Sequence, residues 1–220
     1  MRLSSIAGLL LLVLAPTALL TQDVGLPVLE RFESAPFVPL DVQAHYISSY
    51  DRSGKNDDGF RGTYSALYQD TNLEHVIFDV KGPGCIYTMW FTSREDGWSP
   101  LGWGHIRFYF DDESQPRLDL DSAELFSGLR PPFRFPFVFN PFSSTGGYVC
   151  YFPFPFEKRL KIATEKRVGF YNIYYHSYAA GRSVKSWTGR EATDAVTRTW
   201  SQPGGDFGRL HMVRPVLCDR

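Results

Sequence analysis

Residues 75–92, with the sequence HVIFDVKGPGCIYTMWFT, decide the fold class of this chain. β-Branched and aromatic residues, which favour pleated strands, dominate on both sides of the turn signal Gly82-Pro83-Gly84. We therefore predict two strands, His75–Lys81 and Cys85–Thr92, and we expect them to meet in a hairpin or a corner.

The chain beyond this pair repeats the alternation of short strands and turns. Gly104–Phe110 alternates strictly, which places its even-numbered apolar residues on one face and Arg107 and Tyr109 on the other. Further strands are predicted at Arg117–Leu120, Tyr148–Phe152, Arg159–Thr164 and Val168–His176, the last two joined as a pair near Glu165-Lys166. Short strands with a turn every ten residues or so predict an all-β fold, a sandwich or jelly roll.

Three stretches depart from the strand pattern. Arg130–Pro141 is rich in proline, which cannot donate to a strand ladder, so we expect an edge or an irregular loop there. Ser122–Phe126 is predicted to form one helical turn. Glu191–Trp200 is predicted to form a short helix in a C-terminal segment that is otherwise polar and irregular.

The composition agrees with an all-β domain. Aromatic residues make up 16% of the chain, and 15 prolines and 19 glycines supply frequent turns. The formal net charge of −1 gives no reason to expect nucleic acid or acidic lipid as a partner. No cofactor fingerprint is present, and the scattered histidines lack the spacing of metal ligands, so we predict neither a cofactor nor a metal site.

The N-terminus resembles an export signal. Met1-Arg2 supplies a positive charge, Ile6–Leu14 is apolar, and small residues follow at Ala15–Ala18. We predict a signal peptide at residues 1–22, a jelly-roll domain at 23–180, and at 181–220 a linker with the start of a truncated second domain. The mature protein is then secreted or periplasmic and free of the membrane, although a lone N-terminal anchor is the alternative.

The three cysteines leave two interpretations open. In an oxidising compartment Cys85 and Cys150 could form a bridge, which would leave Cys218 unpaired. Both Cys85 and Cys150 also lie within apolar strand patterns, where a free cysteine packs as a small hydrophobic residue.

The run Ser48–Gly59 is the main candidate for a polar site. It is expected to lie ahead of the first strand, either as a solvated loop or as a sugar-binding loop. Its polar side chains could give the directed hydrogen bonds that sugars require, and they are Asp51, Arg52, Asn56, Asp57 and Asp58. Arg52 could equally form a structural ion pair with Asp51. A calcium loop is disfavoured because Lys55 stands where an oxygen ligand is needed.

Two tryptophans on the loop Ser93–Gly104 are further candidates. Trp98 and Trp103 could stack on sugar rings or could close the loop over the core. The acidic cluster Asp111-Asp112-Glu113 follows an alternating strand, so a hairpin turn is favoured there over a catalytic role.

An ordered set of segments resembles the domain-of-unknown-function 2961 family, later classed as glycoside hydrolase family 172. The segments that carry the resemblance are Ser48–Gly59, Asp79–Tyr87, Ile106–Asp111 and Gly146–Phe156, with Leu125–Gly128 and Phe170–Tyr175 in agreement. The resemblance extends over roughly residues 40–205. It implies the first half of a double jelly roll and a homo-oligomer, trimeric or larger. It also favours the sugar-facing interpretation of Ser48–Gly59.

The resemblance further implies a function. Characterised members act on fructofuranoside or arabinofuranoside linkages with retention of configuration, which requires two neighbouring carboxyl groups. The family's two catalytic glutamates would lie beyond Arg220. We therefore expect an exported glycoside hydrolase-like protein with a furanoside ligand and without the catalytic pair in this chain. The alternative is a non-catalytic carbohydrate-binding or oligomeric assembly module.

Overall fold

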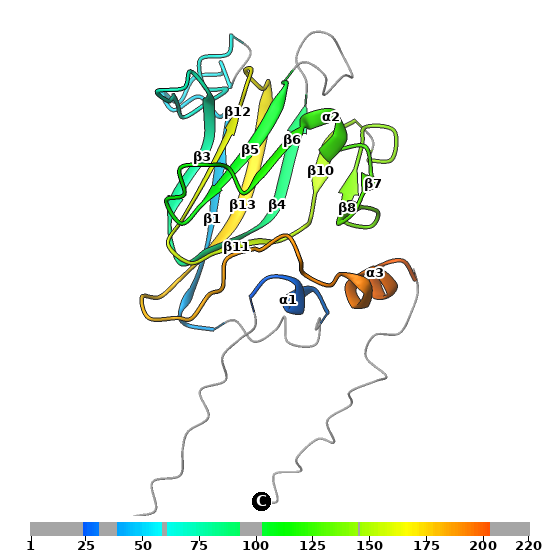
Figure 1. The fold of residues 1–220 in the computed structure, drawn as a ribbon. Helices are drawn as coiled ribbons and strands as arrows, with labels where there is room; N and C mark the ends of the chain where they lie inside the picture. Colours follow the sequence, from blue (N-terminus) through cyan, green and yellow to red (C-terminus); the bar gives the residue numbers. More distant parts are fainter. Residues whose placement is uncertain (1–23, 31–38, 59–60, 93–102, 145, 203–220) are drawn as a thin grey trace, which may run out of the picture.

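The computed structural model of this chain describes residues 24–30, 39–58, 61–92, 103–144 and 146–202. Two antiparallel sheets face each other as a sandwich (Figure 1). Sheet A runs in the order β1 (Val42–Ser48), β13 (Phe170–Tyr178), β4 (Gly84–Thr92), β10 (Tyr148–Cys150) and β9 (Val138–Phe139), with β11 (Phe154–Phe156) also paired to β4. Sheet B runs in the order β2 (Tyr68–Gln69), β3 (His75–Lys81), β12 (Arg159–Thr164), β5 (His105–Phe110) and β6 (Leu118–Asp121).

The pairing of the strands is nested, which defines a jelly roll. β1 pairs with β13, β3 with β12, β4 with β10 and β11, and β5 with β6. The strands nearest the two ends of the domain therefore pair with each other, and each further pair lies between them in the sequence. A long hairpin rolled into two sheets has this arrangement. The predicted all-β, jelly-roll fold is confirmed.

Short elements complete the sandwich. A small ribbon of β7 (Leu129–Arg130) and β8 (Phe133–Arg134) lies in the proline-rich stretch, and α2 (Ser122–Leu125) is the predicted helical turn. α1 (Leu26–Glu30) and α3 (Asp194–Trp200) lie together below the sheets (Figure 1), where the Trp200 indole N–H donates to the Leu29 carbonyl at 3.1 Å. With seven residues, α3 is much shorter than the roughly twenty residues that cross a membrane, and among the described residues no helix is long and apolar enough to do so.

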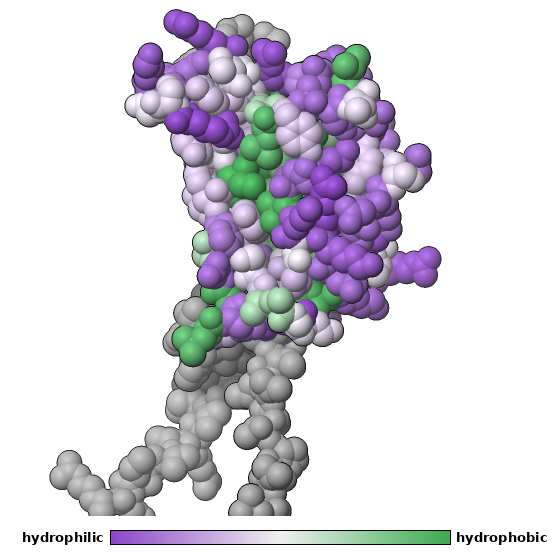
Figure 2. Space-filling view, turned by 90° about the vertical axis from the view of Figure 1, so that its left-hand side faces the viewer, coloured by the Kyte–Doolittle hydropathy of each residue, from purple (hydrophilic) through white to green (hydrophobic). Residues whose placement is uncertain are grey.

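The core fills the space between the sheets, and alternation explains its composition. Ile106, Phe108 and Phe110 of β5 are fully buried, whereas Arg107 lies on the outer face of sheet B, as the sequence predicts. Aromatic rings dominate the interior, as in the contact of Phe108 with Phe154, whose ring centres are 4.7 Å apart. Figure 2 views the sandwich from the side of β1 and β3 and shows an apolar strip between polar surfaces. Ile47 of β1 and Val80 of β3 are only partly buried against the core.

Two expectations about the strands need correction, and one open alternative is decided. β1 precedes the run Ser48–Gly59, so that run follows the first strand instead of leading into it. β12 and β13, predicted as a pair, belong to opposite sheets, because the turn after Thr164 carries the chain across the sandwich. β3 and β4 belong to opposite sheets, so of the two predicted alternatives for Gly82-Pro83-Gly84 the corner is confirmed.

Cys85 and Cys150 are free, buried thiols. In sheet A, Cys150 is opposite Met89 of β4, four residues along that strand from Cys85. At about 3.3 Å per residue this places the two α-carbons roughly 13 Å apart, and a disulfide requires less than about 7 Å. The structure therefore excludes the Cys85–Cys150 bridge and confirms the packing role. Cys218 lies outside the described residues.

Candidate functional site

The loop that follows β1 is organised around the Asp51 carboxylate. One oxygen accepts the Ser53 backbone N–H at 2.9 Å and its hydroxyl at 2.6 Å, and the other accepts the Asp57 N–H at 3.1 Å. Asp51 is 5% exposed. These hydrogen bonds, led by the one from the Ser53 hydroxyl, lower the pKa of Asp51 to about 2. Asp51 is therefore ionised at neutral pH and fixes the shape of the loop.

Asp58 and Arg52 also hold the loop in place. Asp58 accepts the Asp51 backbone N–H at 2.7 Å, which closes the turn from its far end. The Arg52 guanidinium lies 5.3 Å from the Tyr50 ring centre and 5.4 Å from that of Tyr64, and it donates to the Ser48 carbonyl at 3.3 Å. Within the part of the chain that the structure describes, no ion pair joins Arg52 to Asp51.

A hollow of about 540 Å³ opens on this loop. Its lining residues are Asp51, Lys55, Asn56, Asp57, Arg61 and Tyr64. Three of the five candidates that the sequence placed in the run therefore meet here, whereas Arg52 and Asp58 support the hollow from outside. Arg61 and Tyr64 were not predicted. They lie beyond the polar run, and no local pattern links them to it; only the return of the chain beside Asp51 brings them there.

The hollow combines fixed and available polar groups. Asp57 accepts the Arg61 backbone N–H at 2.9 Å, and hydrogen bonding to Asp51 raises the pKa of Tyr64. The side chains of Lys55 and Asn56 are exposed and have no hydrogen-bond partner among the described residues. Two carboxylates face two cations in the lining, so the hollow is formally neutral.

Trp103 belongs to the core. It is 2% exposed, and its ring centre lies 5.2 Å from that of Phe91 and 5.4 Å from that of Tyr148. This corrects the expectation of a sugar-stacking role, because a ring buried on both faces has no surface left for a ligand. Trp98 lies outside the described residues.

The acidic cluster after β5 forms a turn, as predicted. Asp111 and Asp112 have left-handed backbone conformations, with φ of 52° and 64°. Asp111 accepts the Lys158 backbone N–H at 2.9 Å, and Asp112 accepts from the Arg159 guanidinium at 3.1 Å. These carboxylates tie the turn to β12 and do not converge on a cavity.

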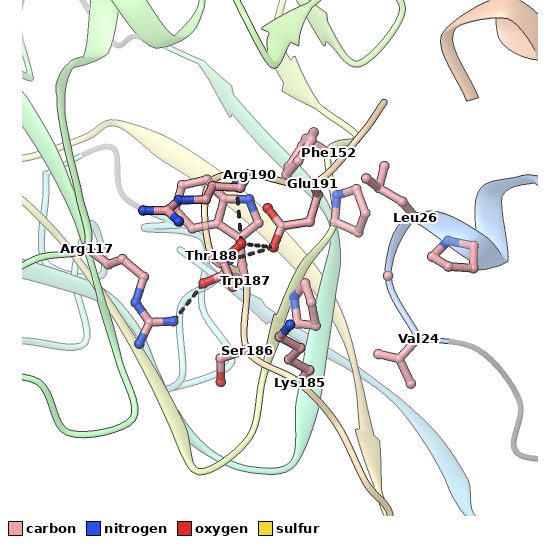
Figure 3. Close-up of a pocket in the computed structure, with 14 residues that line it drawn as sticks. Val24, Leu26, Arg117, Phe152, Lys185, Ser186, Trp187, Thr188, Arg190 and Glu191 are labelled. Carbon is pink, nitrogen blue, oxygen red and sulfur yellow. Dashed lines mark hydrogen bonds between the residues drawn. The ribbon is translucent and has the colours of Figure 1, made fainter. Parts of the chain in front are cut away.

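A second and larger hollow, of about 820 Å³, lies at the lower end of the sandwich (Figure 3). Residues 24–27 form one wall, and residues 185–191 with prolines of the β10–β11 segment form the others. Its polar groups chiefly anchor the chain: Arg117 donates to the Trp187 carbonyl at 2.6 Å, and Thr188 donates to Glu191 through its N–H and its hydroxyl. We place the candidate site in the smaller hollow, because sequence and geometry converge there.

The described residues contain no group of three or more His, Cys, Asp or Glu side chains placed to hold a metal ion. The lining of the smaller hollow consists of neutral and charged hydrogen-bonding groups on a loop whose shape is held by the hydrogen bonds of Asp51.

Fold and loop together define a jelly-roll sandwich with a polar, formally neutral hollow at one end. The family model of the GH172 first beta-sandwich domain matches residues 40–195. The chain belongs to glycoside hydrolase family 172. A search of the curated proteins found no match.

Proposed function

We propose that this chain is the sugar-recognising first sandwich of an exported, furanoside-processing protein, and that the hollow beside Asp51 contacts the sugar. The observation that carries the proposal is that Asp51 and Asn56 have different roles in the loop. Both oxygens of the Asp51 carboxylate accept hydrogen bonds from the loop, whereas the Asn56 amide beside it has no hydrogen-bond partner among the described residues. A rigid loop with free neutral groups suits the many hydroxyls of a sugar.

The balance of charge supports a neutral ligand. Lys55 and Arg61 are offset by Asp51 and Asp57, so a phosphate or a cation would gain no net attraction. A guanidinium can donate two parallel hydrogen bonds to neighbouring hydroxyls, and an amide can donate to one hydroxyl through its N–H while its oxygen accepts from another. Fructofuranosides and arabinofuranosides, which the family resemblance implies, carry such hydroxyl pairs.

We propose recognition and not bond cleavage for this hollow. A retaining glycosidase needs one carboxyl group that gives up and regains a proton near neutral pH. Asp51, with a pKa of about 2, stays ionised there and cannot act as that acid. The catalytic pair would then lie elsewhere in the assembled protein, which we also propose to be a homo-oligomer.

Isothermal titration with methyl arabinofuranoside and methyl fructofuranoside tests the proposal. We expect saturable binding of at least one sugar by the wild type and a loss of at least about tenfold in Asn56→Ala, the scale of one well-placed hydrogen bond to a charged or polar ligand. Asn72→Ala is the matched control, because Asn72 is an exposed asparagine outside the hollow. Equal affinity in wild type and Asn56→Ala would contradict the proposal. Light scattering on the same samples measures the oligomeric state.

A further inference from the structure

The two outer faces of the sandwich differ sharply in charge. The strands of sheet B contain seven charged residues, which are Asp79, Lys81, Arg107, Asp119, Asp121, Arg159 and Lys161. The six strands of sheet A contain no Asp, Glu, Lys or Arg at all. Part of this outer face is buried, because Cys85 and Tyr178 pack there against Val184. The part of β1 and β13 that stays exposed still lacks the charged residues that normally alternate with apolar ones on a solvated sheet.

Aromatic side chains, instead of charged ones, lie on the outer face of sheet A. Tyr46 of β1 and Tyr174 of β13 are directly opposite each other, with ring centres 4.8 Å apart, and are 47% and 50% exposed. One pair further along, Asn172 is opposite Trp90 of β4, which is half-buried against Gly147. The neighbours Ile47 and Ile173 point into the core, so the tyrosines point outward. We call Tyr46, Tyr174, Asn172 and Trp90 the aromatic platform.

The platform offers neutral hydrogen-bonding groups as well as ring faces. The Tyr46 hydroxyl donates to the Asn172 amide oxygen, which leaves the amide N–H groups of Asn172 free to donate outward. The Tyr174 hydroxyl has no partner among the described residues. A sugar ring presents C–H groups on its faces and hydroxyls on its edge, and this surface matches both. Protein interfaces also use tyrosine and tryptophan, so the oligomeric state has to be measured together with sugar binding.

The platform and the hollow beside Asp51 lie on consecutive segments of the chain. β1 runs from Tyr46 through Ser48 directly into the loop. Asp51 is five positions after Tyr46 in the chain, which spans at most roughly 17 Å, a length that several linked sugar units would cover.

We propose that the aromatic platform is a second carbohydrate-binding surface, which holds a neutral glycan chain leading to the hollow. The inference rests on the proposed function, since it names the substrate class as a polymer of neutral sugars and not a short glycoside. The hollow contacts one sugar unit of the glycan, and the platform contacts sugar units farther along the glycan.

Affinity electrophoresis and isothermal titration of the whole chain with linear arabinan and inulin test the platform. We expect Tyr174→Ala to weaken polymer binding by about tenfold, the scale of one aromatic stacking contact, and to leave methyl furanoside binding unchanged. Tyr174→Phe keeps the ring and removes only the hydroxyl, so it should lose less affinity than Tyr174→Ala. The control is Tyr68→Ala, an exposed tyrosine of sheet B that is 43% exposed.

The outcomes separate the platform from the hollow. Unchanged polymer affinity in Tyr174→Ala, or no saturable binding of either polymer by the wild type, overturns the platform. Conversion of an oligomer to monomers by Tyr174→Ala also overturns it, because the face would then be an interface between copies. If Asn56→Ala changes no affinity while Tyr174→Ala weakens polymer binding, the platform stands and the proposed role of the hollow fails.

Discussion

Replacement of Trp103 by alanine should destabilise the fold without affecting sugar recognition. A buried tryptophan removes roughly 200 Å² from water, which at about 25 cal/mol per Å² corresponds to about 5 kcal/mol. Trp103 is 2% exposed and has ring contacts with Phe91, Phe126 and Tyr148, so nearly all of this surface is at stake. Since alanine retains the β-carbon, we expect the free energy of unfolding to fall by about 3–5 kcal/mol.

Urea unfolding followed by far-ultraviolet circular dichroism measures this loss. In a domain of this size each kcal/mol lowers Tm by about 2–4 °C, so Tm should fall by about 6–20 °C. Trp103→Phe fills most of the space and should lose less. Phe142→Ala is the matched surface control, because Phe142 is 89% exposed and should change stability by less than about 0.5 kcal/mol. A loss below about 1 kcal/mol in Trp103→Ala, or weaker sugar binding in Trp103→Phe, would refute the assignment of Trp103 to the core.

Three further predictions test the packing of sheet A and the loop. A β-carbon at Gly147 would lie 2.2 Å from the Trp90 ring nitrogen. Gly147→Ala should therefore lower the free energy of unfolding in urea by about 1–3 kcal/mol and shift the tryptophan emission. An unchanged urea midpoint would count against this contact. Burial raises the pKa of the Cys150 thiol to about 12 and that of Cys85 further, so neither should react with iodoacetamide at pH 8 until urea unfolds the chain. Peptide mass mapping separates these two sites from Cys218, and rapid labelling of Cys85 or Cys150 in the folded protein would contradict this. Asp51 has a folded-state pKa of about 2, below its ordinary value of 3.8, so its stabilisation is present above pH 4 and is lost as pH falls from about 4 to 2. In Asp51→Asn the urea midpoint should therefore change less with pH over that range than in the wild type. An unaltered pH profile would contradict the anchoring role of Asp51.

Local signals predicted the strands better than their partners. His75–Lys81 and Arg159–Thr164 are strands with the predicted bounds, because β-branched residues and flanking turns mark them locally. Their sheet membership depends on contacts far apart in the sequence, such as those of β13 with β1 and β4, which no local pattern encodes. β1 was missed because VQAHYIS mixes small and polar residues among its apolar ones.

The candidate site was predicted in outline only. The sequence placed polar chemistry in the run Ser48–Gly59, and the hollow lies there. It could not distinguish Asp51, whose oxygens serve the loop, from Asn56, whose amide is available, since that difference arises from backbone geometry. Trp103 was ambiguous for a related reason: a tryptophan on a loop has the same local context whether it covers the core or faces solvent.

Binding of a furanoside beside Asn56 is the central claim, and NMR titration tests it most directly. The side-chain amide signals of Asn56, assigned by comparison with Asn56→Ala, are followed as methyl arabinofuranoside and methyl fructofuranoside are added. Our account predicts that these signals shift saturably with one of the sugars, while the indole N–H signal of the buried Trp103 keeps its chemical shift. Asn56 signals that stay fixed up to about 10 mM sugar, well above a typical millimolar Kd, would contradict it.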